Sequence, residues 1–483
     1  MHILLVNPNR MLPPVAPIGL DYVAASLSRR GYEPVLCDLT FADDAVGPWE
    51  ATLTDAIGAT APSAVGVSIR NIDDAYFASQ DFVLENTARM IKHIRTQTDR
   101  PVILGGVGFS SAPRIVLEYT GADYGIAGEG DPALADLLDC IAAKGDPAGV
   151  PGAVFCNAKG HIVSAPPRAS DLGALPVPRR RFVDNVRYFA EGGQAGIETK
   201  RGCPGACIYC VDPVAKGSRT RVRTPDSVSD EFADLLGQGI NVVHLCDCEF
   251  NLPVDHARAV CEALVRRGLA SEVRWYTYAC AKPFDDELAR AMRAAGCAGV
   301  NFGVDHCDNA MLRRLGRSYT ADDIRRTVQA CRDAGLTVMC DMLLGGPGET
   351  PETLASAIDG MRAFGPDCIG LSCGVRVYPN TPIADMVRAQ GPFESNPNLH
   401  GTTTDNADLL RPIYFIDSAV GPEIHARVTE LVGGDKRFFH ADPDQVEGNY
   451  NYNDNSVLMQ AIRAGARGAY WDILRNASAR ARQ

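Results

Sequence analysis

The stretch CPGACIYC, residues 203–210, sets Cys203, Cys207 and Cys210 at C-x3-C-x2-C spacing, with Tyr209 directly before the last cysteine. Three thiolates this close together can hold three irons of a [4Fe–4S] cluster and leave the fourth iron without a protein ligand. An open iron can bind a substrate or a cofactor. A structural zinc site would usually show a fourth Cys or His at short spacing, and residues 199–216 contain none. The spacing therefore predicts an iron–sulfur cluster.

Length and charge limit the function classes. A chain of 483 residues is too long for one core, so we expect two or three domains. The composition, 46% apolar and 22% charged, is ordinary for a globular enzyme. The net charge of −12 argues against non-specific nucleic-acid binding, which needs a basic face. We therefore expect no nucleic-acid partner.

The sixteen cysteines do not form a dense disulfide framework. Cys261, Cys331 and Cys340 stand alone on apolar segments and are typical of small core residues. Free thiols beside a cluster motif indicate a reducing compartment. The N-terminus, MHILLVNPN, lacks the basic and long apolar regions of a signal peptide, and no apolar run approaches the roughly 18 residues that span a membrane. We expect a cytoplasmic protein without a membrane partner.

Residues 1–145 alternate short apolar runs with helical patterns. The runs HILLVN, EPVLCDL, AVGVSI, PVILGG and DYGIAG predict five parallel strands. Five strand–helix units indicate a doubly wound, Rossmann-like α/β sheet, which binds ligands beyond the carboxyl ends of its strands. Those ends carry Asn9, Arg70, Gly105, Gly106, Gly108, Gly128, Glu129 and Gly130. No G-x-G-x-x-G follows the first strand, so a dinucleotide fingerprint is missing.

A connector over 146–194 begins with a predicted hairpin at 152–166 and continues as a Pro-rich linker. Residues 195–385 then repeat strand and helix. The predicted strands are 195–200, 241–247, 273–279, 299–305, 336–344 and 369–377. Six such units predict a partial (β/α)6 barrel of the TIM type, with its active site at the carboxyl ends of the strands. The cysteine motif follows the first of these strands.

The strand–helix alternation stops in the tail, 386–483, which we expect to be mainly helical and to face the substrate. Helices are predicted at 422–433 and 456–475. The segment GNYNYNDN, 448–455, has two open interpretations. It could line a substrate pocket over the barrel mouth, or it could be a surface cluster of turns, which Asn, Gly and Asp favour.

The longer stretch IETKRGCPGACIYC, 197–210, resembles the cluster loop of radical S-adenosylmethionine (SAM) enzymes that carry a cobalamin-binding domain. In order and position, residues 1–385 resemble that family. The resemblance implies a [4Fe–4S] cluster on the three cysteines, SAM on the open iron and cobalamin on the first domain. The residues implied for SAM are Tyr209, Asp247, Glu249, Asp305, Gly345, Gly346, Pro347 and Arg376. The strand-end residues of the first domain are implied for cobalamin.

One departure concerns the lower face of cobalamin. Many cobalamin proteins carry D-x-H-x-x-G after the first strand, with a His that ligates cobalt. Here that loop is NPNRMLPPVAP, 7–17, without a His. Arg70 is the candidate to lie near that face, where a permanent charge disfavours ligation. The alternative is that Arg70 pairs with Asp73 or Asp74 on its own loop.

The resemblance implies a methyltransferase that moves a methyl group from SAM through cobalamin to a carbon of a small-molecule or peptide natural product. An external electron donor of flavodoxin or ferredoxin type would supply electrons. Ring rearrangement or cyclisation without methyl transfer is the alternative, and methylation of an aromatic carbon such as tryptophan C2 is a minor one. A cobalamin sensor would leave the cluster motif unexplained. A tRNA-methylthiolating enzyme would need a second cysteine triplet, whereas Cys37, Cys140 and Cys156 are scattered.

Cys246 and Cys248 alternate on a predicted strand and so face the same side. They could act as redox groups or as an extra ligand, but packing is the expected role for each.

Overall fold

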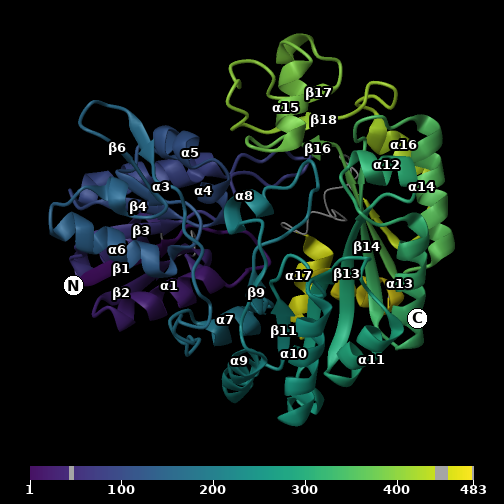
Figure 1. The fold of residues 1–483 in the computed structure, drawn as a ribbon, viewed down its shortest axis with the longest axis horizontal. Coiled ribbons are helices and arrows are strands. Elements are labelled where there is room, and N and C mark those ends of the chain that lie inside the picture. The colour runs from purple at the N-terminus through teal and green to yellow at the C-terminus, as the bar shows by residue number, and fades with distance from the viewer. Residues whose placement is uncertain (43–47, 441–454, 481–483) are drawn as a thin grey trace.

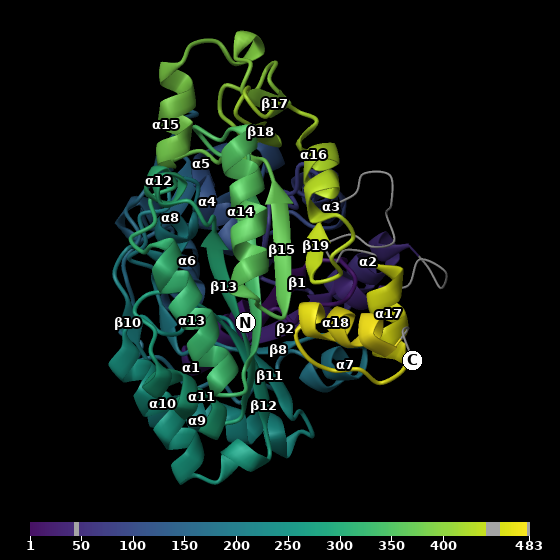
Figure 2. The same ribbon diagram turned by 90° about the vertical axis from the view of Figure 1, so that its right-hand side faces the viewer.

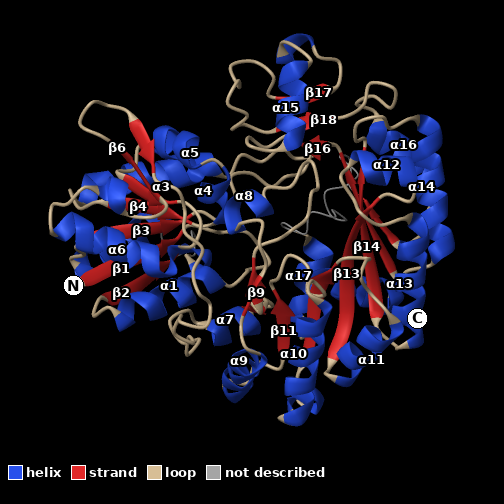
Figure 3. Ribbon diagram, in the orientation of Figure 1, coloured by secondary structure: helices blue, strands red, loops and turns tan. Residues whose placement is uncertain are grey.

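The computed structural model describes residues 1–42, 48–440 and 455–480. Figure 1 shows two α/β units side by side, with a smaller unit of strands and one helix above them. The N-terminal unit is purple to blue and the central unit is teal to green. Figure 3 shows that strands form the middle of both large units and that helices cover them. Within the described residues, no helix is long and apolar enough to cross a membrane.

The N-terminal sheet has the predicted doubly wound fold. Its parallel strands are β1 (His2–Asn7), β2 (Glu33–Asp38), β3 (Ala64–Ser68), β4 (Val102–Gly105) and β5 (Tyr124–Ile126). Its helices are α1 (Ile18–Arg29), α2 (Trp49–Thr60), α3 (Leu84–Gln97), α4 (Val107–Ser111), α5 (Pro113–Thr120) and α6 (Gly130–Ala142). The strand order β2-β1-β3-β4-β5 reverses direction between β1 and β3. Ligands of such sheets bind at that reversal, beyond the carboxyl ends of the strands.

The predicted connector hairpin forms, but it belongs to the first sheet. Its strands are β6 (Ala153–Cys156) and β7 (Ile162–Ser164), and β6 pairs antiparallel with β5. An edge strand presents unpaired backbone groups that another strand can satisfy. The N-terminal sheet therefore extends past residue 145 to Ser164.

The central unit is the predicted partial barrel. Its six parallel strands are β8 (Ala195–Ile197), β11 (Val242–Leu245), β12 (Arg274–Ala279), β13 (Cys297–Asp305), β14 (Thr337–Leu344) and β15 (Cys368–Cys373). The covering helices include α9 (Pro225–Gly237), α10 (Val254–Arg266), α11 (Asp286–Ala294), α13 (Ala321–Asp333) and α14 (Pro351–Phe364). A seventh strand from the tail, β19 (Phe438–His440), adds parallel to β15.

Period-two alternation gives the barrel sheet two different faces. Val300, Phe302 and Val304 of β13 lie in the core beneath the helices. Asn301 and Gly303 therefore lie on the opposite face, which turns toward the N-terminal unit (Figure 1). We call this the inner face.

Local sequence sets the starts of the outer helices. Thr320 and Asp323 form the predicted capping box of α13, because each side chain accepts a hydrogen bond from the other's backbone N–H. Asp285 accepts from Leu288 N at 2.8 Å and caps α11. Such caps fix where each strand-to-helix loop ends, and these loops carry the site.

The tail adds strands as well as helices. β16 (Val375–Arg376), β17 (Leu399–Gly401) and β18 (Ile413–Phe415) form a small antiparallel sheet beside α15 (Pro382–Ala389), and α16 (Ile424–Val432) follows. The helix predicted at 456–475 is two helices, α17 (Ser456–Arg463) and α18 (Tyr470–Arg480). Gly465 and Gly468 break it with positive φ angles of 93° and 153°. Of the segment GNYNYNDN, 448–454 lie outside the described residues, and Asn455 caps α17.

The last two helices close one end of the barrel. Figure 2 shows α17 and α18 packed together at the end of the sheet opposite α15 and β17. Trp471 lies on the inner face, 2.8 Å from where a Cβ on Gly299 would stand. Trp471 also packs edge-on against Tyr276, with ring centroids 5.9 Å apart. This end is the amino end of the strands, so the carboxyl ends are left for the site.

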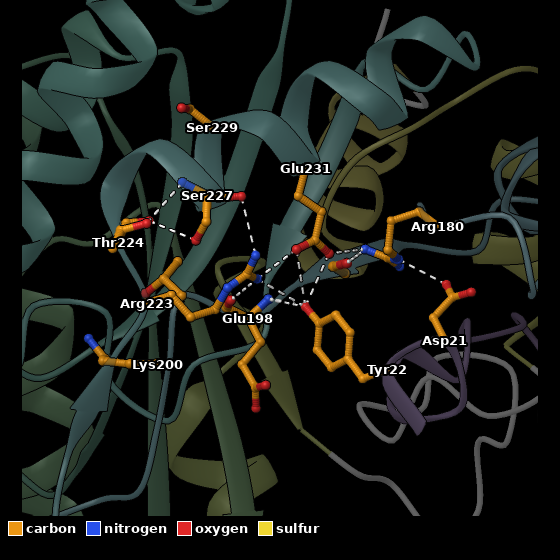
Figure 4. Close-up of polar contacts among 12 residues, drawn as sticks. Asp21, Tyr22, Arg180, Glu198, Lys200, Arg223, Thr224, Ser227, Ser229 and Glu231 are labelled. Carbon is orange, nitrogen blue, oxygen red and sulfur yellow. Dashed lines mark hydrogen bonds and ion pairs between the residues drawn. The ribbon is translucent and has the colours of Figure 1, made fainter. Parts of the chain in front are cut away.

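A buried charge network joins the two large units (Figure 4). Arg180 of the connector donates from Nε to Asp21 of α1 at 2.8 Å and from a terminal nitrogen to Glu231 of α9 at 2.6 Å. Arg223 donates to the other oxygen of Glu231 at 2.6 Å. The Tyr22 hydroxyl donates to Glu231 at 3.1 Å. The two arginines balance the two carboxylates, so the network fixes the units against each other without a net buried charge.

Candidate active site

Neighbouring segments hold the cysteine loop in place. Cys203 N donates to Gly217 O at 3.0 Å, and Ile208 N donates to Leu315 O at 3.1 Å. Gly202 has φ 89°, and a Cβ there would stand 2.1 Å from Arg219 O. Glycine is required at this position because both the backbone angle and the close approach exclude a side chain.

The three thiols are arranged suitably for a cluster. A Cβ on Gly205 would lie 3.3 Å from Cys203 Sγ and 3.7 Å from Cys207 Sγ, so both sulfurs border the same glycine. Cys203 and Cys207 both act electrostatically on Cys210. Across the described ranges, no three ligand-type side chains converge on a single metal ion. In a cubane cluster each thiolate binds a different iron, so convergence on one point is not needed.

Cys248 and Cys246 are not core residues, so the packing role expected for them is wrong. The Cys248 thiol hydrogen-bonds Cys203, and this bond is the main cause that lowers the pKa of Cys203 to about 6. Lys216 Nζ lies 3.5 Å from Cys248 Sγ. Cys246 is exposed on the inner face. Strand alternation does place both cysteines on the side of the site, as the spacing predicts.

Tyr209 and Asp305 meet, as two predicted SAM-binding residues should. The Tyr209 hydroxyl lies 2.8 Å and 2.9 Å from the two oxygens of Asp305. Arg317 closes the group, with Nε 2.5 Å from Asp305 Oδ2 and a terminal nitrogen 2.7 Å from the Tyr209 hydroxyl. Asp305 has φ 63°, and the register shifts between Gly303 and Asp305, which turns the carboxylate out of the strand pattern.

Arg317 is a site residue that the sequence motifs do not reveal. It lies in the loop between α12 (Asn309–Arg314) and α13, where no spacing rule marks it. Its side chain is only 10% exposed and neutralises Asp305. Because Arg317 and Tyr209 occupy the Asp305 carboxylate, the predicted contact of Asp305 with SAM competes with a buried ion pair.

Glu249 and Asp247 have different surroundings, although both were predicted to bind SAM. Burial is the main cause that raises the pKa of Glu249 to about 8, and Cys203 and Asp305 raise it further. Glu249 therefore faces the cysteine loop. Asp247 instead accepts from Thr199 N at 2.8 Å and lies 3.8 Å from Lys200 Nζ. Asp247 is buried, and these contacts orient the segment that leads into the loop.

The GGPGET loop packs against the segments around the cysteines. Gly345 has φ 87°, and its N–H lies 3.4 Å from the buried carboxylate of Glu349. A Cβ on Gly346 would stand 3.0 Å from a Leu315 methyl group. Leu315 also binds the cysteine loop through its carbonyl, so this loop, which includes Pro347, supports the cluster loop through one intermediate residue.

Arg376 was predicted to bind SAM, and in the structure its guanidinium is held by internal partners. Its Nε donates to Asp73 at 2.8 Å, and its terminal nitrogens donate to backbone carbonyls of Val377, Leu409 and Leu410. These contacts use the guanidinium donors inside the protein, so Arg376 ties the Asp73 loop to the barrel. Sequence gives no sign of a partner 303 residues away.

Glu129 was predicted to bind cobalamin, but groups of the protein itself bind its carboxylate. It accepts from Ser170 N at 3.0 Å and forms ion pairs with Arg201 and Arg221. Its partners are a backbone N–H of the connector and two arginine side chains of the central unit. Glu129 therefore couples the N-terminal sheet to the strand pair β9 (Lys200–Arg201) and β10 (Arg221–Val222) that borders the cysteine loop.

At most of the glycines that were predicted to bind cobalamin, close packing inside the protein already accounts for the absence of a side chain. A Cβ on Gly106 would lie 2.4 Å from Ile69 O, and one on Gly108 would lie 2.8 Å from an Ile69 methyl group. Gly128 faces Pro167 at 3.0 Å, and Gly130 faces Val23 at 3.3 Å. Only Gly105 of this set has open space where its side chain would be.

Asn9 and Arg70 remain at the reversal between β1 and β3, where the fold binds ligands. Asn9 is buried, and its Nδ2 has no hydrogen-bond partner in the part of the chain that the structure describes. Arg70 is exposed and lines the same hollow. Asp73 pairs with Arg376, and Asp74 accepts from the Ser79 hydroxyl. Within the described chain Arg70 pairs with neither aspartate, so the alternative role suggested by the sequence is wrong.

Arg70 extends toward the barrel. It is one of the charges that act on the Tyr278 hydroxyl of β12 and on the Tyr470 hydroxyl of α18. Helix α4 of the N-terminal unit packs against α8 (Asp212–Lys216), which directly follows Cys210. The ligand-binding edge of the first sheet and the cysteine loop therefore open onto the same space between the units.

Comparisons with known proteins agree with this geometry. The B12 binding domain family matches residues 11–138, and the Radical SAM superfamily matches residues 197–359. Tryptophan 2-C-methyltransferase of Streptomyces laurentii is 30% identical, over 97% of this chain and 95% of that protein. The chain belongs to the cobalamin-dependent radical SAM methyltransferases. An uncharacterized methyltransferase of Pyrococcus horikoshii is 25% identical, over 71% of this chain and 72% of that protein.

Solved structures of this family superpose over the whole chain. TsrM from Kitasatospora setae with tryptophan substrate and a SAM analog is 32% identical with a TM-score of 0.92, covering 100% of this chain and 99% of that one. Its form with cobalamin and a [4Fe–4S] cluster gives a TM-score of 0.88 at 32% identity, with 100% of both chains covered. The cofactors of this methyltransferase are therefore a [4Fe–4S] cluster, SAM and cobalamin, as the cysteine spacing and domain order predict.

Proposed function

We propose that this methyltransferase methylates an aromatic carbon of tryptophan or of a closely related indole compound. The observation that carries the proposal is the similarity to tryptophan 2-C-methyltransferase along nearly the entire chain, tail included. In the sequence analysis this was the minor alternative. The similarity includes the tail and is therefore not confined to the two cofactor-binding domains, which supports a shared substrate class.

Arg70 supports the same proposal. Its guanidinium has no lone pair to donate, because it stays protonated and offers only N–H donors. Placed beneath cobalt, it leaves the lower face without a ligand. The loop 7–17, without a His, cannot supply one from the usual position.

The chain's own residues have three tasks in this proposal. Cys203, Cys207 and Cys210 hold the cluster, and Glu249, Tyr209 and Arg317 border SAM beside it. Asn9, Arg70 and the open backbone at Gly105 contact cobalamin. When bound, cobalamin supplies the methyl carrier and the cluster supplies electrons from an external flavodoxin- or ferredoxin-type donor. The two units exclude water from the space between them.

Methyl-labelled SAM tests the function directly. Holoenzyme, reductant and L-tryptophan should give labelled methyltryptophan together with S-adenosylhomocysteine. A rearranged or cyclised product without label would replace the proposal by the first alternative. Labelled transfer to a tryptophan-containing peptide but not to the free amino acid would correct the substrate class.

Changing Arg70 to His should convert the ligand-free lower face into a ligated one. Imidazole has a nitrogen lone pair that can coordinate metal. We expect the electron-spin spectrum of cob(II)alamin to show axial nitrogen hyperfine splitting in Arg70→His and none in the wild type. Arg70→Lys, which keeps the charge, should resemble the wild type. Nitrogen hyperfine splitting in the wild type would contradict the placement of Arg70.

A further inference from the structure

The inner face of the barrel carries one polar layer that the cofactor-binding residues do not use. It consists of Cys246, Tyr278, Asn301 and Asp341, and we call it the polar layer. Its strand neighbours Leu245, Ala279, Val300, Phe302, Cys340 and Met342 all lie in the core beneath the helices. One level closer to the amino ends of the strands, Tyr276, Met339 and Cys368 are sealed by Trp471 and Ala469 of the tail. The polar layer is therefore the first level above the closed end of the barrel.

The orientation of the Asn301 amide is fixed by its neighbour. Asn301 is 4% exposed, and its Nδ2 donates to Asp341 Oδ2 at 2.7 Å. A carboxylate only accepts hydrogen bonds, so the nitrogen must face Asp341 and the oxygen must point away. Among the described residues, Asn301 Oδ1 is buried and has no hydrogen-bond partner. An unsatisfied buried acceptor destabilises a fold by about 1–3 kcal/mol, which is recovered when a ligand donates to it.

Glycines flank Asp341 on both neighbouring strands. The register pairs Asp341 with Gly303 of β13 and with Gly370 of β15. Side chains on either strand would otherwise crowd the carboxylate at this level. Tyr278 is 44% exposed in the same layer, and the Asp341 charge contributes to raising its pKa. The layer thus places acceptor oxygens on the face turned toward Arg70.

We propose that Asn301 and Asp341 form a subsite for a protonated primary amine of the substrate. A carboxylate and an amide oxygen match two of the three donors of an ammonium group, and the Tyr278 hydroxyl matches the third. The identity of the amine-bearing molecule rests on the proposed function. The subsite adds that the amine end of the substrate, and not a carboxylate end, faces the barrel interior.

Binding to the anaerobic holoenzyme tests this subsite with three probes: L-tryptophan, tryptamine and indole-3-propionate. The wild type should bind tryptophan and tryptamine. Asp341→Asn keeps the shape of the side chain and removes its charge. It should lower the affinity for tryptophan and for tryptamine at least tenfold, while SAM affinity, iron content and cobalamin content stay unchanged. Asn301→Ser should weaken both as well. Asp359→Asn, on the exposed side of α14, is the matched control and should change nothing.

The outcomes separate the subsite from the proposed function. If Asp341→Asn binds tryptophan and tryptamine as tightly as the wild type, the subsite is overturned and the function stands. If the wild type binds none of the indoles, the proposed function is overturned. Thermal denaturation in the presence of benzylamine, phenethylamine or histamine then tests the subsite by itself. At least one amine must then raise the melting temperature of the wild type but not of Asp341→Asn. If none does, the subsite is overturned too.

Discussion

Replacing Cys203, Cys207 and Cys210 together by Ala should lower the iron content after anaerobic reconstitution from about four per chain to near zero. Each thiolate binds one iron, and the loop provides no other sulfur at the same spacing. Methyl transfer should be abolished with the cluster. Iron and sulfide assays, together with the electron-spin spectrum of the reduced protein, measure the loss.

Cys248 makes the control for this experiment informative. It hydrogen-bonds Cys203 but lies outside the motif. Cys248→Ala should keep about four irons per chain, because three ligands remain. If the triple variant retained its full cluster, the cysteine loop would not be the ligand set. If Cys248→Ala lost iron to the same extent as the triple variant, the fourth cysteine would have to be counted among the ligands.

Replacing Arg180 by Met should lower the free energy of unfolding by about 3–5 kcal/mol. The substitution leaves the buried carboxylates of Asp21 and Glu231 without their shared cation. It also removes the ion-pair bridge from Asp21 of α1 to Glu231 of α9, while the Tyr22–Glu231 hydrogen bond remains, so the two units should separate at lower denaturant concentration. Urea unfolding followed by Trp fluorescence and by circular dichroism measures both effects.

Two further variants show whether burial causes this effect. Arg30→Met breaks ion pairs with Asp136 and Asp139 that are about half exposed, so it should change stability by less than about 1 kcal/mol. Arg180→Met combined with Glu231→Gln should be less unstable than the sum of the single variants, since one unpaired charge is gone. Wild-type stability in Arg180→Met would mean that the network does not hold the units together.

Much of the fold is predictable because its signals are local. HILLVN and AVGVSI are apolar runs bounded by turn residues, and the alternation in CAGVNFGVD assigns each side chain to one face of β13. The capping box at Thr320 and Asp323 marks the start of α13 within four residues. The tail is different. Its helical pattern of apolar residues runs on through Gly465 and Gly468, which break the helix, and β19 pairs with a strand about 70 residues earlier.

The site divides in the same way. Tyr209 and the three cysteines share one short stretch of sequence, and the structure brings Glu249, which follows the next barrel strand, to face it. Arg376 and Glu129 follow the strands where ligand-binding residues were expected. Other groups of the protein nevertheless bind both side chains. Arg317 belongs to no sequence motif, and yet it neutralises the charge of Asp305. A charged side chain's availability depends on which opposite charge lies within a few ångströms, and no periodicity encodes that.

The spacing of neighbouring residues is enough to predict the cluster ligands, the two parallel sheets and the histidine-free loop. Only the tertiary structure shows that Arg70, within the described residues, pairs with neither Asp73 nor Asp74, since both carboxylates are bound elsewhere. It also decided that Asn301 is left with a buried acceptor beside Asp341. Both outcomes depend on the competition of hydrogen-bonding groups for partners inside the protein. The groups that find no internal partner are the ones that remain for a ligand.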